Sequence, residues 1–213
     1  MNEQVIVLAT KNNGKKKELN SLLKKFPVKI MNLDDFGPIP EIIEDGESFD
    51  DNAYKKASLT ARYLGYTAMA DDSGLVVNSL EGRPGVYSAR YAGENADDLH
   101  NIEKLLKEME HIDDRSAAFE CVISIAVPTG HALTYEGRCE GLITREPMGT
   151  GGFGYDPVFY YPDFKKTFAE ISMEEKSKIS HRGKALQEVC NEMDKVLVWI
   201  EQNLPKLEKF KCH

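Results

Sequence analysis

The sequence has little of what marks secreted, membrane-spanning or nucleic-acid-binding proteins. Its 213 residues include 4 cysteines and no Cys-x-x-Cys pair, which argues against a disulfide framework or a zinc site. No apolar run approaches the roughly 18 residues of a membrane helix, and we expect no signal peptide because the first residues lack its basic start and long apolar stretch. Basic residues are fewer than acidic ones: the chain has 27 Lys and Arg and 35 Asp and Glu, which gives a net charge of −8. We therefore expect a cytoplasmic protein without membrane or nucleic-acid partners.

What the sequence contains is enough apolar material for a folded core. Hydrophobic residues make up 41% of the chain and charged residues 29%, as in ordinary globular proteins. No repeat, low-complexity tract or linker divides it. We expect one domain over residues 1–213, with two lobes around a cleft.

Apolar periodicity predicts strands that alternate with helices and are followed by a hairpin. This order indicates an α/β fold with a mixed β-sheet flanked by helices. The predicted strands cover residues 5–9, 28–33, 67–70, 75–77, 117–127, 132–138 and 158–161. The predicted helices include one around Leu19–Leu23, one from the Ser48 cap to Leu64, one from the Asn95 cap to Met109, one opening at Ser172, and one apolar stripe from Leu186 to Leu204.

Two glycine-containing loops resemble nucleotide-binding motifs without satisfying them. Residues 9–16 lie where a P-loop would lie, but Ala9 and Lys16 replace two of its required residues. A helix N-terminus there still offers N–H groups to an anion, so a phosphate site and a solvated basic turn both stay open. Residues 149–154 match the glycine pattern of a dinucleotide-binding motif, which must be followed by a helix. Here Asp156-Pro157 follows, and a residue before proline disfavours helical geometry. Their aromatic residues are better suited to a flat ligand.

The adjacent carboxylates Asp71 and Asp72 interrupt an otherwise apolar strand region. Buried carboxylates are costly unless cations pair with them. On an extended segment their side chains point to opposite faces, so one can bind magnesium while the other is fixed by neighbours. A simple Asp-Gly turn is the structural alternative.

Two further segments concentrate polar groups. Residues 41–47 form an acidic loop that offers oxygen ligands of the kind magnesium prefers, although acidic loops are more often simply solvated. Hydrogen-bond donors gather between two predicted helices near the C-terminus, and this arrangement is typical of a recognition site. These donors are Lys176, Ser180, His181 and Arg182.

Taken together, these segments resemble the dITP/XTP pyrophosphatases, also called inosine triphosphate pyrophosphatases. The resemblance covers nearly the whole chain, in order, through residues 8–15, 48–53 with Lys56, 70–75, 84–91, 151–157, 175–177 and 180–183. It implies an elongated sheet that forms the bottom of a cleft between two lobes. It also implies a homodimer and an Mg²⁺-dependent hydrolase. This enzyme would convert ITP, dITP or XTP to the monophosphate and pyrophosphate and so remove non-canonical nucleotides from the nucleotide pool.

The resemblance also assigns roles to residues of this chain. Asp72 corresponds to the general base and a metal ligand. The substrate contacts, mostly to phosphate, are Thr10, Lys11, Asn12, Asn13, Gly14, Lys15, Lys56, Ser73 and Lys176. The nucleobase pocket comprises Phe153, Gly154, Tyr155, Asp156, His181 and Arg182.

One position departs from the family pattern. Ile43 stands where many members carry an acidic metal ligand, which leaves Glu41 and Glu44 as candidates; we assign Glu44. Discrimination against ATP would come from donors, on Arg182, His181 or backbone N–H groups, that bind the 6-keto group of inosine or xanthine. The alternatives are a pyrophosphatase of different base specificity and a nucleotide-binding regulator without turnover.

Overall fold

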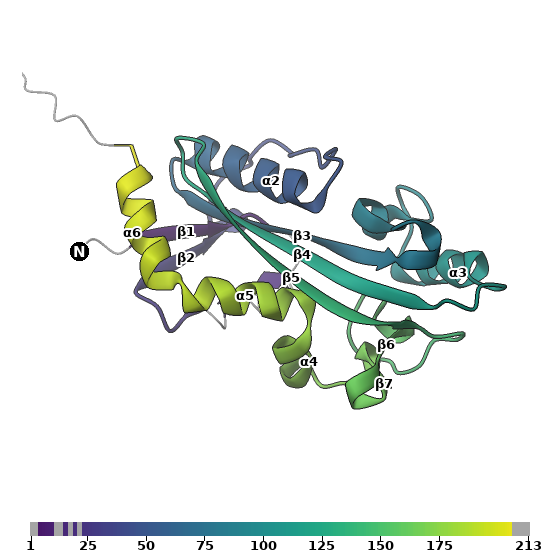
Figure 1. Ribbon diagram of the computed structural model, residues 1–213. Coiled ribbons are helices and arrows are strands. Elements are labelled where there is room, and N and C mark those ends of the chain that lie inside the picture. Colours follow the sequence, from purple (N-terminus) through teal and green to yellow (C-terminus); the bar gives the residue numbers. More distant parts are fainter. Residues whose placement is uncertain (1–3, 11–14, 17–18, 21–22, 206–213) are drawn as a thin grey trace, which may run out of the picture.

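The predicted α/β fold, with its elongated mixed sheet, is confirmed. A computed structural model describes residues 4–10, 15–16, 19–20 and 23–205 (Figure 1). Within them one seven-stranded sheet has the order β2-β1-β3-β4-β5-β6-β7, with β1 parallel to β2 and β3 and the later pairs antiparallel. The strands are β1 (Gln4–Leu8), β2 (Val28–Asn32), β3 (Thr67–Val77), β4 (Ser116–Ala126), β5 (Ala132–Ile143), β6 (Phe159–Tyr161) and β7 (Lys166–Thr167). The helices are α2 (Phe49–Leu64), α3 (Asp98–Glu108), α4 (Met173–Ile179), α5 (His181–Asn191) and α6 (Met193–Asn203).

Helices cover both faces of this sheet, and its two ends carry separate cores. Helix α2 lies on one face and α5 lies on the other (Figure 1). Alanines of α2 pack against Ala68 and Ala70 of β3, so this helix approaches the sheet closely. A larger core around Ile6, Met69 and Leu186 fills the opposite face. A third cluster, at the far end of the sheet, surrounds Leu105 of α3 and Phe159. The first two clusters lie at one end of the sheet and the third at the other, and these two ends form the two predicted lobes, while a single domain over 1–213 stays a prediction.

Strand β3 corrects the sequence-based prediction in its middle. We expected two short strands separated by residues 71–74, but β3 is continuous and pairs with β4 from Ala68↔Ala126 to Val77↔Ala117. The turn interpretation of Asp71 and Asp72 is therefore wrong. The polarity of residues 71–74 predicts an interruption of the strand. In the structure, cations from distant parts of the chain pair with the two carboxylates, so the strand continues through them.

The predicted helix boundaries are confirmed at some positions and wrong at others. Ser48 accepts a hydrogen bond from the Asp51 amide and caps α2, and Ser172 caps α4 within a capping box. Asp97, rather than Asn95, caps α3. The last predicted helix is two helices, because the chain leaves helical geometry at Glu192. The buried stripe of Leu186, Val189, Met193, Val196 and Ile200 continues across this break, so periodicity could not reveal it.

The strand predicted at 132–138 continues to Ile143, and the strand β7 was not predicted. Residues 15, 16, 19, 20 and 23 are helical, as expected for the first helix. Cys121, Cys139 and Cys190 are buried thiols. None of the helices in the described part of the chain has both the length and the apolarity needed to cross a bilayer.

Candidate active site

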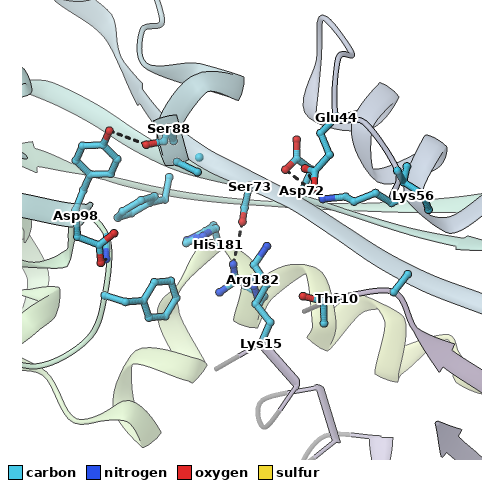
Figure 2. Close-up of a pocket in the computed structure, with 18 of the residues that line it drawn as sticks. Thr10, Lys15, Glu44, Lys56, Asp72, Ser73, Ser88, Asp98, His181 and Arg182 are labelled. Carbon is cyan, nitrogen blue, oxygen red and sulfur yellow. Dashed lines mark hydrogen bonds and ion pairs between the residues drawn. The ribbon is translucent and has the colours of Figure 1, made fainter. Parts of the chain in front are cut away.

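A cleft opens where β1 ends and β3 continues. The pairing of β1 with β3 stops at Leu8↔Met69, while the pairing of β3 with β4 continues to Val77. Beyond Met69, where β1 no longer pairs with it, β3 borders a cavity of about 460 Å³. Figure 2 shows Glu44, Lys56 and Asp72 grouped in one part of this cavity and Asp98 at its far side. The predicted residues that line it are Thr10, Lys15, Glu41, Glu44, Lys56, Asp72, Ser73, Phe153, Gly154, Tyr155, Asp156, Lys176, His181 and Arg182.

Asp71 and Asp72 point to opposite faces of β3, as the strand alternation predicts. Asp71 contacts Arg182 of α5 on one face. Asp72 contacts Lys56 of α2 on the other. The two neighbouring carboxylates therefore have different environments, which allows them different roles.

Asp71 is the centre of a buried ion network. Its Oδ2 lies 2.7 Å from Lys15 Nζ and 3.1 Å from Arg182 Nε. Arg182 also donates from Nη2 to the Ser73 hydroxyl at 2.9 Å. Burial alone would raise the pKa of Asp71, but the charges of Lys15 and Arg182 outweigh burial and hold that pKa well below its usual range. Asp71 is therefore a permanent anion that fixes the two cations at the edge of the cleft.

Asp72 has the opposite electrostatic character. Burial raises its pKa, and the neighbouring charge of Glu44 adds to this effect, while Lys56 opposes it. Lys56 Nζ lies 3.5 Å from Asp72 Oδ1 and 2.8 Å from Glu44 Oε2, so one ammonium lies between two carboxylates. Burial lowers the pKa of Lys56, but the surrounding carboxylates outweigh burial and raise it. This group of three side chains retains a net negative charge.

The donor set of this part of the cavity suits a hard divalent cation. No group of three or more His, Cys, Asp or Glu side chains converges on one point among the described residues. Two carboxylates, Asp72 and Glu44, do converge, since both lie against Lys56. Magnesium is typically held by one or two protein carboxylates together with waters and substrate phosphates. The residues present fit such an ion. Ile43 is exposed, and Glu41 also lines the cavity.

The glycine-rich loop supplies an aromatic surface flanked by cations. Gly152 and Gly154 have φ of 74° and 60°, a conformation that favours glycine. The intervening Phe153 is 45% exposed, and Lys176 Nζ lies 4.6 Å from its ring centroid. Buried Asp156 anchors the loop by accepting the Phe153 N–H at 3.0 Å and by pairing with Lys176. The loop therefore presents an exposed aromatic ring beside a cation, and its use as a surface for a flat ligand stays a prediction.

His181 lies at the first turn of α5 and belongs to the wall of the cleft. Its ring stacks on Phe119, with ring centroids 4.7 Å apart and planes 15° apart. Gly137 lets the backbone at the start of α5 lie close to β5, since a Cβ there would collide with the His181 carbonyl oxygen and lie 2.7 Å from the Ala185 nitrogen. Burial, together with the charges of Arg182 and Lys176, holds the pKa of His181 well below 6.5. The imidazole is therefore neutral in the folded protein.

This neutral histidine predicts a pH dependence of stability. Below about pH 6.5 the unfolded chain binds a proton at His181 that the folded chain excludes. Because the unfolded state then binds more protons, this residue lowers the free energy of unfolding as pH falls, by about 1.4 kcal/mol per pH unit. Urea titrations between pH 7 and 5 should show this slope reduced in His181→Phe and unchanged in the exposed control His131→Phe. Equal slopes in both variants would contradict the assignment.

The predicted site and the cavity in the structure do not contain the same residues. The predicted phosphate contacts Lys11, Asn12, Asn13 and Gly14 lie outside the described residues. Asn52 contacts Asp72, and Thr60 lines the cavity, yet neither was singled out. With Lys56 they form a polar series at four-residue intervals along α2, and this signal could have revealed both. Asp98, which accepts the Gly154 N–H at 2.6 Å, had no such signal.

Comparisons with known proteins agree with this geometry. The model of the Ham1 family matches residues 6–192. The dITP/XTP pyrophosphatase of Desulfotalea psychrophila is 60% identical over 94% of this chain and 90% of that protein. The dITP/XTP pyrophosphatase of Syntrophobacter fumaroxidans is 56% identical over 94% of this chain and 86% of that protein.

A solved structure agrees as well. A HAM1 protein from Coxiella burnetii superposes with a TM-score of 0.86 and 43% identity, over 90% of this chain and 99% of that one. Both the sequence and the fold are thus shared along most of the chain. The chain belongs to the Ham1 family.

Proposed function

We propose that this protein hydrolyses non-canonical purine nucleoside triphosphates, with ITP, dITP and XTP as substrates, to the monophosphate and pyrophosphate. The single observation that carries the proposal is the group of Asp72, Lys56 and Glu44 inside a cleft that also holds the cations of the Asp71 network. The names of the relatives, dITP/XTP pyrophosphatases, support the same reaction. We place this activity in the cytoplasm, where free nucleotides are the substrate pool.

The cations of the cleft bind the triphosphate. Lys15 lies at one wall, held by Asp71, and Lys176 lies beside Phe153. Fixed positive charges of this kind stabilise the charge that develops on a departing pyrophosphate. Because Asp71 fixes Lys15 and Arg182 before substrate arrives, these side chains need no reorganisation during the reaction.

Asp72 is the general base. Its pKa is raised by burial, so the carboxylate is a stronger base than an exposed aspartate and accepts a proton from the attacking water more readily. Asp72 and Glu44 would hold Mg²⁺, which screens phosphate charge and activates water when bound. Lys56, between the two carboxylates, keeps Asp72 ionised.

The nucleobase binds at the Phe153 side of the cleft. The half-exposed ring provides a stacking face, and Lys176 and Arg182 lie 4.6 Å and 5.9 Å from its centroid. A 6-keto purine places an acceptor where adenine places a donor. A site built around a hydrogen bond to that acceptor leaves its own donor unpaired when adenine binds, and such a mismatch can discriminate by about 10⁴-fold.

A substrate profile tests the function. Pyrophosphate release is to be measured with ITP, XTP, GTP, ATP and dUTP in the presence of Mg²⁺. We expect kcat/KM for ITP and XTP to exceed that for ATP by at least about 100-fold, because a hydrogen-bonding mismatch costs this much or more.

The other results of this profile identify the alternatives. Equal turnover of ATP and ITP, or a preference for dUTP, would indicate a pyrophosphatase of different specificity. Magnesium-dependent binding of ITP without pyrophosphate release would indicate a regulator. The family resemblance also supports a homodimer, and sedimentation of the purified protein would check this.

A further inference from the structure

A buried amide connects the two carboxylate-bearing segments of the cleft. Asn52, in the first turns of α2, is 1% exposed. Its Nδ2 donates to Asp72 Oδ2 at 3.1 Å, and its Oδ1 accepts the Gly46 N–H at 2.8 Å. One side chain thus hydrogen-bonds both β3, which carries Asp72, and the acidic loop, which carries Glu44.

The two oxygens of Asp72 therefore have different partners. Oδ2 is held by the neutral amide of Asn52, whereas Oδ1 faces the ammonium of Lys56. Both side chains project from α2, but Lys56 has a long, flexible side chain that also pairs with Glu44, whereas the short side chain of Asn52 is buried and held by two hydrogen bonds. The amide contact is the part of this arrangement that fixes the orientation of the Asp72 carboxylate.

The acidic loop is built to meet this amide. A Cβ on Gly46 would lie 2.7 Å from Asp51 Cβ and 2.8 Å from Asn52 Oδ1, so only glycine lets the loop lie this close to α2. Two residues earlier, the Glu44 carbonyl accepts a hydrogen bond from Arg90 Nη2 at 3.1 Å. The loop is therefore attached at Glu44 and at Gly46, and the second attachment passes through Asn52.

We propose that Asn52 is a positioning residue, which sets the orientation of Asp72 and its separation from the Glu44 loop. This inference rests on the function proposed above. An amide donates and accepts at once, as the two contacts require, while a carboxylate only accepts and an alkyl group does neither. The neutral amide also leaves the negative charge of Asp72 and Glu44 undiminished for a divalent cation.

Two substitutions of similar shape separate the two contacts. Asn52→Asp keeps an acceptor for Gly46 but places a second carboxylate against Asp72, and Asn52→Leu removes both contacts. Loss of a partner that orients a ligand typically lowers activity about 10- to 100-fold. We expect kcat for ITP to fall by this factor in Asn52→Leu and by at least as much in Asn52→Asp, with KM nearly unchanged because the phosphate contacts remain.

A stability control and a second readout keep this test decisive. Val196→Ala, in the α6 core remote from the cleft, lowers stability and should leave kcat unchanged below its melting temperature. Binding of Mn²⁺ alone, measured by electron paramagnetic resonance, should weaken in Asn52→Leu and not in Val196→Ala. Wild-type kcat in Asn52→Leu, or Mn²⁺ affinity equal to that of the wild type, would overturn the proposal. Absence of any triphosphate hydrolysis by the wild type would instead overturn the proposed function, and the Mn²⁺ comparison would still decide the role of Asn52.

Discussion

Replacing Asp72 by asparagine is expected to lower kcat for ITP by about 10²- to 10⁴-fold, the range that a positioned general base contributes. The substitution keeps the shape of the side chain and its place opposite Asn52, but removes the proton acceptor and one carboxylate of the proposed metal site. Pyrophosphate release under saturating ITP and Mg²⁺ measures the effect.

The same variant should remain folded. Burial raises the pKa of Asp72, which means that the folded protein disfavours the charged form of this side chain. A neutral asparagine removes that penalty, so the free energy of unfolding should be equal or higher. Asp113→Asn, at a fully exposed loop position, serves as a control that changes the same charge without touching the cleft. An Asp72→Asn enzyme that kept most of its activity would contradict the role of Asp72 as the base.

Replacing Asp71 by alanine is expected to lower the free energy of unfolding by about 3–5 kcal/mol, the usual result of removing one member of a buried ion network. Lys15 and Arg182 both lie against Asp71 Oδ2, and the Arg182 side chain is nearly as buried as the carboxylate. Without Asp71 these two largely buried cations repel each other with no carboxylate between them.

Urea titrations measure this loss, and an exposed ion pair provides the comparison. Glu120 of β4 pairs with Arg138, and both side chains are partly exposed. Because exposed pairs contribute about 0–1 kcal/mol, Glu120→Ala should have a small effect. Similar losses in the two variants would show that the Asp71 network is not the stabilising element described above.

The sequence predicted the orientation of the two adjacent carboxylates better than the strand that carries them. Opposite orientation of Asp71 and Asp72 follows from the two-residue period of any strand, and it is confirmed even though this stretch was not predicted as strand. The continuity of β3 was missed because its stability depends on Lys15, Lys56 and Arg182, which are distant in the sequence. Local propensity contains no information about such partners.

The donors grouped near the C-terminus show a second limit. Lys176, His181 and Arg182 were expected to act as one recognition site. In the structure Lys176 pairs with Asp156, His181 stacks on Phe119, and Arg182 joins the Asp71 network. All three line the same cavity, but their immediate partners differ. The closeness of these residues in the sequence identified this wall of the cavity. Which partner each side chain contacts depends on the fold and could not be predicted.

The long ladder between β3 and β4 has a consequence for amide hydrogen exchange. Asp72 lies near the middle of ten paired positions, from Ala68 to Val77. Amides in such a ladder exchange mainly through opening of the whole sheet, while segments held by a few contacts exchange through local opening. We expect the strand around Asp72 to be among the slowest-exchanging parts of the protein. The loop around Gly154 should exchange much faster, and under the proposed function nucleotides would enter and leave by local motions of this loop while Asp72 keeps its place.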